Sequence, residues 1–248
     1  MLSAVILTFN EEKRIADCIR SVKDVADEVW VIDSRSTDNT VTIAENEGAK
    51  VCSIEWKGWV HARNSAVELV SFDFILFVDA DERLSNELVN SIKLEKSLHF
   101  PHQVYLLNRL NHIGTQAIVH GAWFPDYKLR MYHKSRVSWR GGKVHEWADA
   151  GTVKPFLLNG YLLHYGYQSI EEVKLKTKKY ASLASQSLHH KPKFILTLKM
   201  LFSPPVRFVR DYIIKSGFRD GRVGFNIALE SGREVFLKYS KALFVKTA

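Results

Sequence analysis

The sequence lacks several features that would place it outside the ordinary globular proteins. It has two cysteines in 248 residues, Cys18 and Cys52, and no Cys-x-x-Cys pair. A disulfide framework is therefore not expected, and a reducing compartment fits best. No apolar run reaches the roughly 18 residues that favour a membrane-spanning helix, so none is predicted. The chain starts directly with an apolar run and has no basic leader, so we expect no signal peptide.

Acidic residues are scarce in the last hundred residues. Residues 1–150 carry 18 Lys+Arg and 21 Asp+Glu, a net charge of −3, whereas residues 151–248 carry 17 and 6, a net charge of +11. This asymmetry indicates a polyanionic partner for the C-terminal part, such as a membrane surface, nucleic acid or a phosphorylated glycan. A basic solvated face is the alternative. Nucleic acid is not expected as a partner, because no recognised binding motif is present.

What the first hundred residues do contain is an alternation of short apolar runs and amphipathic segments. The apolar runs predict strands at residues 3–8, 28–33, 50–54 and 74–78. Ile15, Cys18, Ile19 and Val22 lie on one face of a predicted helix, which Asn10 could cap. The alternation predicts an α/β fold with a mainly parallel sheet and helices on both faces.

After residue 100 the pattern changes. Further strands are predicted at residues 103–111, 127–132 and 155–163, and Ser169 with Glu172 predicts the start of a helix. Beyond residue 191, apolar clusters are mixed with Lys and Arg, and Pro204–Pro205 is expected to interrupt them. Residues 1–190 are therefore expected to form one domain, and residues 191–248 a basic, amphipathic helical extension.

Three carboxylates follow the ends of predicted strands. Asp33 ends the second strand, and Asp79 and Asp81 follow the fourth in the segment FILFVDADERL. Ligands of parallel sheets bind at the carboxyl ends of the strands. The paired aspartates can hold Mg²⁺ or Mn²⁺, can belong to an aspartyl phosphatase, or can simply cap the next turn. Arg83 stands where the phosphatase pattern has Thr or Val, which disfavours that class.

Four sequence elements occur in order around these carboxylates. They are residues 8–11 (TFNE), 33–40 (DSRSTDNT), 62–64 (ARN) and 79–81 (DAD). In this order and spacing the segment resembles the family 2 glycosyltransferases, which are inverting enzymes with the GT-A fold. The resemblance therefore implies a GT-A, Rossmann-like domain and a nucleotide-sugar donor.

The second half of the chain narrows the resemblance. Residues 123–134 (WFPDYKLRMYHK), 143–147 (KVHEW) and 162–167 (LLHYGY) are similar to the small family 2 enzymes of the lipopolysaccharide inner core. These are β-1,4-glucosyltransferases that add glucose to a heptose. The resemblance covers nearly the whole chain and implies UDP-glucose as donor and a heptose acceptor.

The resemblance assigns a nucleotide-sugar site. It places Asp33 against the uracil or ribose, Thr8, Asn10 and Glu11 along the base and ribose, and Arg63 at the diphosphate. A guanidinium suits the last role because it forms paired hydrogen bonds to phosphate oxygens. Asp33 and Asn10 could instead be helix caps, and Arg63 a surface arginine.

The resemblance also assigns metal ligands and a base. Asp81 would bind the divalent metal, Mg²⁺ or Mn²⁺, directly, and Asp79 would hold the ribose or a metal-bound water. His164 could be a further ligand, or a hydrogen-bonded core residue. An inverting transfer needs a carboxylate that takes the proton of the acceptor hydroxyl. Glu146 is the first candidate for this base and Asp126 the second.

The tail and the tryptophans suggest contacts beyond the donor. Amphipathic basic helices bind anionic leaflets, so we expect a cytoplasmic protein that lies peripherally on the inner face of the cytoplasmic membrane. Packing of these helices on the catalytic domain is the alternative. Trp123, Trp139 and Trp147 could stack on sugar rings or belong to the core.

The function expected from the sequence is metal-assisted transfer of a hexose onto a lipopolysaccharide-core heptose. A family 2 enzyme that uses a polyprenyl phosphate or another cell-surface glycan as acceptor is the rival enzyme. A catalytically silent nucleotide-sugar-binding protein is the rival from another class, and the joint presence of Asp79, Asp81 and Glu146 disfavours it.

Overall fold

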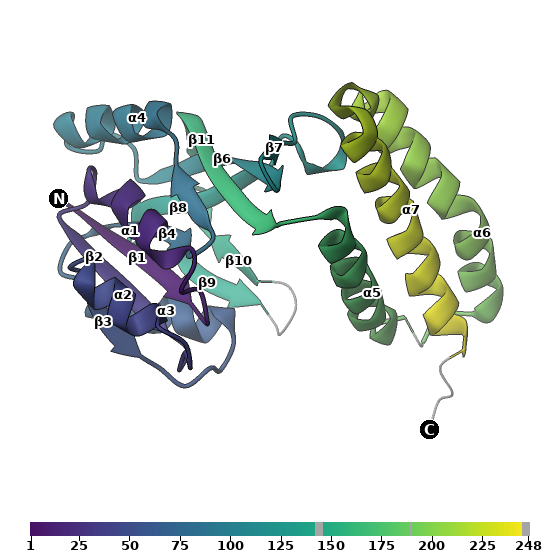
Figure 1. Cartoon of the computed structure of the whole chain (residues 1–248), viewed down its shortest axis with the longest axis horizontal. Coiled ribbons are helices and arrows are strands. Elements are labelled where there is room, and N and C mark those ends of the chain that lie inside the picture. Colours follow the sequence, from purple (N-terminus) through teal and green to yellow (C-terminus); the bar gives the residue numbers. More distant parts are fainter. Residues whose placement is uncertain (142–145, 189, 245–248) are drawn as a thin grey trace. The chain divides into compact units, whose positions relative to one another are not determined.

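The chain divides into two compact units. A computed structural model describes residues 1–141, 146–188 and 190–244 (Figure 1). The first unit comprises Met1–Arg109 and Asp126–His164, and the second comprises Leu110–Pro125 and Tyr165–Ala248. The boundary expected after residue 190 does not coincide with this division, because the segment before it groups with the helices that follow.

The first unit is built on a parallel arrangement of four strands. These are β1 (Leu2–Thr8), β2 (Glu28–Asp33), β3 (Lys50–Ser53) and β4 (Phe74–Asp79), in the spatial order β3-β2-β1-β4. All seven residues of β1 are buried, which explains why apolar residues follow one another from Ala4 to Leu7 instead of alternating with polar ones. The four strands predicted from the apolar runs are confirmed.

Helices cover both faces of these strands. They are α1 (Ile15–Lys23), α2 (Thr40–Asn46), α3 (Trp59–Leu69) and α4 (Asn86–Ser97). Side chains of β1 alternate between two cores: Ile6 belongs to the core that contains residues of α1 and α4, and Leu7 to the core that contains residues of α3. The predicted inner face of α1 is confirmed, since its buried residues are the four of the helical pattern. Each large apolar side chain buried in this way contributes about 1.5–3 kcal/mol.

The remaining strands of this sheet join it mainly by antiparallel pairing, and the last residues of β6 and β11 belong to the second unit. They are β5 (Glu82–Leu84), β6 (Val104–Ile113), β8 (Tyr127–His133) and β11 (Phe156–Tyr167), and the sheet continues from β4 in the order β8-β6-β11-β5. Strand β8 pairs antiparallel with both β4 and β6. A separate hairpin is formed by β9 (Ser138–Gly141) and β10 (Glu146–Asp149). The predicted α/β class is confirmed, with a parallel half that carries the strand ends of interest.

The second unit is mainly helical. Its main helices are α5 (Ile170–Gln186), α6 (Lys193–Val209) and α7 (Gly221–Phe244), and α7 packs against both others (Figure 1). Smaller elements are β7 (Gln116–Ala117), η1 (Gly121–Trp123), η2 (Arg210–Ile214) and η3 (Gly217–Asp220). Ser169 caps α5, because its hydroxyl accepts a hydrogen bond from the Glu172 amide, as the sequence predicted. In the described part of the chain, no helix combines the length and hydropathy of a membrane span.

Two local predictions are wrong. Asn10 does not cap α1, because the chain turns after β1 and the helix begins only at Ile15. Pro204 and Pro205 do not interrupt the basic segment, because α6 continues through both to Val209. A proline removes one backbone donor each time, but packing along α7 keeps this helix intact.

Candidate active site

The carboxyl ends of three parallel strands meet at one edge of the sheet. Thr8 of β1 is in register with Asp33 of β2, and Leu7, one residue earlier, is in register with Asp79 of β4. The register thus brings Thr8, Asp33 and Asp79 to neighbouring positions. The hydroxyl oxygen of Thr8 is buried and has no hydrogen-bond partner within the described residues.

The loops after β1 and β2 are joined by side-chain hydrogen bonds. Asp33 is buried and accepts hydrogen bonds from the amide and the hydroxyl of Ser36, at 2.9 and 2.5 Å. Asn10 has a positive φ of 53° and accepts a hydrogen bond from the Thr37 amide at 2.8 Å. These bonds fix both loops at the strand edge, which gives Asn10 and Asp33 structural roles whether or not they also contact a nucleotide.

Glu11 lies on the same loop and forms an ion pair with Arg14, at 3.0 Å. Burial raises the pKa of Glu11, and the nearby Asp81 carboxylate acts in the same direction, while Arg14 opposes both. The influence of Asp81 indicates that the loop after β1 approaches the carboxylates after β4.

Asp79 is held by two arginines. Its carboxylate accepts hydrogen bonds from Arg63 at 3.2 Å and from both terminal nitrogens of Arg130. Burial alone would raise the pKa of Asp79, but Arg130 and Arg63 outweigh it and hold the pKa well below its usual range. Asp79 is therefore ionised, and the two guanidinium groups fix its orientation.

Two residues of this network carried no prediction from the sequence. Glu82 is fully buried in β5; its carboxylate accepts from Arg130 at 3.0 Å and from the Asp79 amide at 2.9 Å. Arg130, on β8, is buried as well, and Asp79 and Glu82 together raise its pKa although burial opposes this. The one signal in the sequence is a lone arginine between Leu129 and Met131 in a strand-like run.

Arg63 is buried among aromatic rings. Its side chain comes from α3, the residue is only 3% exposed, and its guanidinium carbon lies 4.2 Å from the ring centre of Trp139 and 5.5 Å from that of Phe77. Burial and the neighbouring Arg130 lower the pKa of Arg63. Two of its nitrogens, Nε and Nη1, have no hydrogen-bond partner within the described residues. A buried cation with unused donors is suited to bind an anionic group.

Asp81 and His164 come together after β4. The His164 Nε2 atom lies 3.3 Å from an Asp81 carboxylate oxygen, because β11 pairs with β5 so that His164 is opposite Glu82. Burial would raise the pKa of Asp81, but the hydrogen bond from His164 outweighs it and lowers the pKa. The described residues contain no group of three or more His, Cys, Asp or Glu that could hold a metal. An oxygen and a nitrogen ligand side by side still fit a cation that takes its other ligands from water and phosphate.

The two candidate bases differ in their surroundings. Glu146 begins β10, opposite Gly141, and its carboxylate acts to raise the pKa of Arg63, so it lies near the arginine cluster, which consists of Arg63 and its neighbour Arg130. Asp126 binds Arg109 at 2.8 Å and Lys128 at 2.8 Å. Burial would raise the pKa of Asp126, but Arg109 and Lys128 lower it. His145, which precedes Glu146 in the similar motif, lies outside the described residues.

The three tryptophans do not form one group. Trp139 is buried against Phe77 in the first unit, whereas Trp147 is exposed on β10. Trp123 belongs to the second unit and stacks on Tyr167. Trp139 is therefore a core residue that also packs on Arg63.

Comparisons with known proteins agree with this arrangement. The model of glycosyl transferase family 2 matches residues 3–150. An uncharacterized glycosyltransferase of Rickettsia felis is 34% identical over 97% of this chain and 88% of its own length. The lipopolysaccharide core biosynthesis glycosyltransferase LpsC of Rhizobium meliloti is 27% identical over 97% of this chain and 91% of its own.

Among solved structures, glucosyl-3-phosphoglycerate synthase of Mycobacterium tuberculosis matches 45% of this chain and 44% of its own, at 28% identity and a TM-score of 0.37. That partial similarity indicates nothing about substrate. The family model covers more than half of the chain, and the Rickettsia relative nearly all of it. The chain therefore belongs to glycosyl transferase family 2 and is a glycosyltransferase, as its strand-end motifs predicted.

Proposed function

We propose that the chain transfers glucose from UDP-glucose to a heptose of the lipopolysaccharide inner core by an inverting single displacement. The family assignment supports the reaction class, and the similarity to LpsC supports the acceptor class. The observation that carries the site is the pairing of Asp81 with His164 beside the arginine cluster, at the edge where the strands end. A lipid-linked glycan of another kind is the alternative acceptor.

The donor would be bound along the loops at the strand edge. The unpartnered hydroxyl of Thr8 and the carboxylates of Asp33 and Glu11 offer polar contacts to a base and a ribose, and Asn10 fixes the loop between them. Arg63 offers two unused nitrogens to the diphosphate. Burying the Arg63 guanidinium costs less because its Nη2 atom lies 3.2 Å from an Asp79 carboxylate oxygen. Arg63 would therefore be in place before the donor binds.

Asp81 and His164 are the residues that would hold a divalent metal, and Asp79 would orient a ribose or a water beside it. When bound, Mg²⁺ or Mn²⁺ neutralises the negative charge that develops on the leaving diphosphate. Asp81 is ionised at neutral pH, since its pKa is lowered, and His164 can ligate only in its unprotonated form.

Glu146 is the better candidate for the base. A base must be free to accept a proton, whereas Asp126 is held by two cations that stabilise its ionised form. Glu146 lies near Arg63, where the diphosphate would bind, so an acceptor hydroxyl beside it would be close to the reacting carbon. It would take that proton while the bond to UDP breaks, which gives a β-linked product from an α-linked donor.

Separate variants test donor binding and chemistry. Asp81→Asn should weaken metal-dependent UDP-glucose binding about tenfold or more, measured by calorimetry with and without EDTA. Asp73→Asn, on an exposed aspartate paired with Lys134, is the matched control and should bind normally. Donor affinity unchanged in Asp81→Asn would remove the metal role.

Glu146→Gln should keep donor affinity but lower the turnover of UDP-glucose with acceptor by about 10²–10⁴-fold. Asp126→Asn is its matched control and should lower turnover far less. A larger loss in Asp126→Asn than in Glu146→Gln would transfer the role of base to Asp126.

We also propose that α6 binds an anionic membrane. One side of this helix, the α6 apolar face, is exposed to solvent; Phe202 is 64% exposed. The α6 apolar face consists of Phe194, Leu198, Leu201, Phe202 and Val206. Lys193 and Lys199 are on the same helix, so apolar side chains and ammonium groups could enter an anionic interface together. A peripheral position on the inner face of the cytoplasmic membrane would present a lipid-anchored acceptor.

Vesicle sedimentation tests this proposal. Phe194→Ser/Phe202→Ser should lose binding to vesicles rich in phosphatidylglycerol, and Lys193→Glu/Lys199→Glu should make the residual binding less salt-sensitive. Leu94→Ser is the control, because Leu94 is 59% exposed on α4 of the first unit. Equal sedimentation of all variants would refute the α6 apolar face as the membrane contact.

A further inference from the structure

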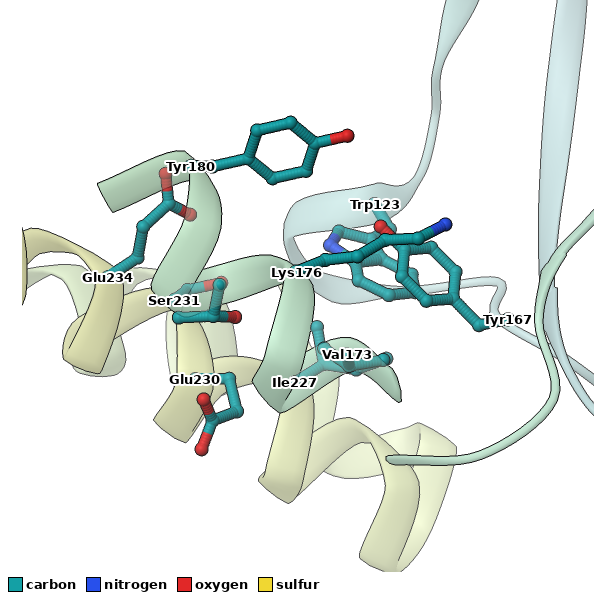
Figure 2. Close-up of a pocket in the computed structure, with 10 residues that line it drawn as sticks. Trp123, Tyr167, Val173, Lys176, Tyr180, Ile227, Glu230, Ser231 and Glu234 are labelled. Atoms are coloured by element: carbon teal, nitrogen blue, oxygen red, sulfur yellow. The ribbon is translucent and has the colours of Figure 1, made fainter. Parts of the chain in front are cut away.

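The second unit contains a cavity to which no role has been assigned above. It lies between α5 and α7, is about 80 Å³ in volume, and is lined by residues of the second unit, Trp123, Tyr167, Lys176 and Glu230 among them (Figure 2). A cavity of this size holds several water molecules or part of a small ring. The residues proposed for donor, metal and base all belong to the first unit.

Glu230 supplies an unpartnered charged group to this cavity. It lies on α7 and is only 4% exposed. One carboxylate oxygen accepts a hydrogen bond from Arg233 at 3.2 Å, but the other, Oε2, is buried and has no hydrogen-bond partner within the described residues. A buried carboxylate oxygen is strongly disfavoured without a donor, so Oε2 would gain from a donor placed in the cavity.

Aromatic rings and one ammonium group line the other side. The rings of Trp123 and Tyr167 stack with centroids 5.0 Å apart and an angle of 25°. The Lys176 ammonium lies 4.2 Å from the Tyr167 centroid and donates to the Gly166 carbonyl at 2.9 Å. Figure 2 shows these three side chains together, apart from Glu230 and Glu234 on α7, with the Tyr180 ring at the rim.

The mixture of groups limits the class of ligand. A cation would be repelled by Lys176, and an anion by Glu230 and Glu234. A neutral ligand with several hydroxyl groups satisfies both, because a hydroxyl donates to a carboxylate and accepts from an ammonium group. Aromatic faces favour a ligand that also has an apolar side, as pyranose rings have.

We propose that this cavity receives one side of a saccharide ring of the acceptor glycan, with one hydroxyl donating to Glu230 Oε2 and another accepting from Lys176. The inference rests on the proposed function only in taking the acceptor to be a glycan. It assigns to the second unit a sugar-binding role that is separate from donor binding.

Calorimetric titration of the full chain with delipidated, heptose-containing lipopolysaccharide core oligosaccharide tests the inference. Donor and metal are left out, so that only saccharide binding is measured. Glu230→Gln should weaken this binding about fivefold, because the acceptor loses its charge while the side chain keeps its shape. Tyr180→Leu should weaken it about threefold, through loss of the ring at the rim. Glu171→Gln, on an exposed carboxylate of α5, and Tyr161→Leu, in the first unit, are the matched controls and should change binding less than twofold.

The outcomes separate this inference from the proposed function. Absence of saccharide binding by the unaltered chain, which is the result if the cavity holds water only, would overturn it. Equal affinity in Glu230→Gln, Tyr180→Leu and both controls would overturn it too. Tyr180 is 49% exposed, so its variant stays informative if Glu230→Gln does not fold. Saccharide binding that depends on Glu230, in a chain that never turns over UDP-glucose, would support the inference and contradict the proposed function.

Discussion

The buried network around Arg130 makes a sharp prediction about stability. Arg130 donates to both carboxylate oxygens of Asp79 and to Glu82; Arg130 and Glu82 are buried, and the Asp79 side chain is 24% exposed. Arg130→Met fills a similar volume but removes the positive charge. Asp79 then keeps Arg63 at 3.2 Å, and Glu82 keeps Arg109 at 3.4 Å and the Asp79 amide at 2.9 Å.

Removing one partner of a buried ion pair typically costs about 3–5 kcal/mol. Since each carboxylate retains one arginine, we expect Arg130→Met to lower the free energy of unfolding by about 3 kcal/mol. That is a large share of the roughly 5–15 kcal/mol that stabilises a typical domain. Lowering the pH should reduce the difference in the free energy of unfolding between Arg130→Met and the unaltered chain. The pKa of Asp79 is lower in the folded chain than its value of about 3.9 in the unfolded chain, so ionised Asp79 stabilises the fold above about pH 3.9. This stabilisation is lost as the pH falls towards the pKa of Asp79 in the folded chain.

The assay is urea denaturation followed by tryptophan fluorescence. Five of the six tryptophans lie in the first unit and only Trp123 in the second, so the signal mainly reports unfolding of the unit that contains Arg130. Glu82→Gln should recover about 1–2 kcal/mol in the Arg130→Met background, because it removes a buried charge that has lost its main partner. A loss below about 1 kcal/mol in Arg130→Met, or strictly additive effects of the two substitutions, would refute the reasoning.

Two further predictions concern other parts of the fold. Burial would raise the pKa of Glu28, but hydrogen bonds from Ser71 and Lys50 outweigh it and lower the pKa to about 2. Glu28→Gln should therefore lower the free energy of unfolding by about 2 kcal/mol at pH 7, measured by urea titration. The difference from the unaltered chain should shrink as the pH falls from about 4.5 towards 2, and a difference that stays constant with pH would contradict this. Gly224→Ala should lower the thermal midpoint, because an added Cβ would lie 2.0 Å from the Gly217 carbonyl oxygen. Helix propensity alone predicts the opposite sign, so a raised midpoint would show that this contact relaxes freely.

Much of the parallel half of the fold could be predicted from the sequence. Continuous apolar runs marked the parallel strands, and the rule that ligands meet strand ends placed Asp33 and Asp79 at one edge. The inner face of α1 followed from helical spacing alone. These features depend on local pattern, which a single sequence contains.

The rest of the site depends on pairing between distant segments. Arg130 and Glu82 meet Asp79 because β8 pairs antiparallel with β4, and nothing in the run around Arg130 specifies that neighbour. Asp81 and His164 were predicted as candidates, but their approach depends on the pairing of β5 with β11. The predicted cap at Asn10 is wrong for the same reason: its side chain accepts a hydrogen bond from Thr37, in the loop after β2, instead of from the helix that follows it.

The most direct test of the central claim is UDP release by the purified chain. A panel of UDP-sugars would be supplied with Mg²⁺, Mn²⁺ or EDTA, with and without heptose-terminated lipopolysaccharide core. The proposed function predicts metal-dependent release from UDP-glucose that this acceptor stimulates and that Asp81→Asn and Glu146→Gln strongly reduce. Release that is equal in EDTA, or that is unaffected by the heptose acceptor with every donor, would contradict it.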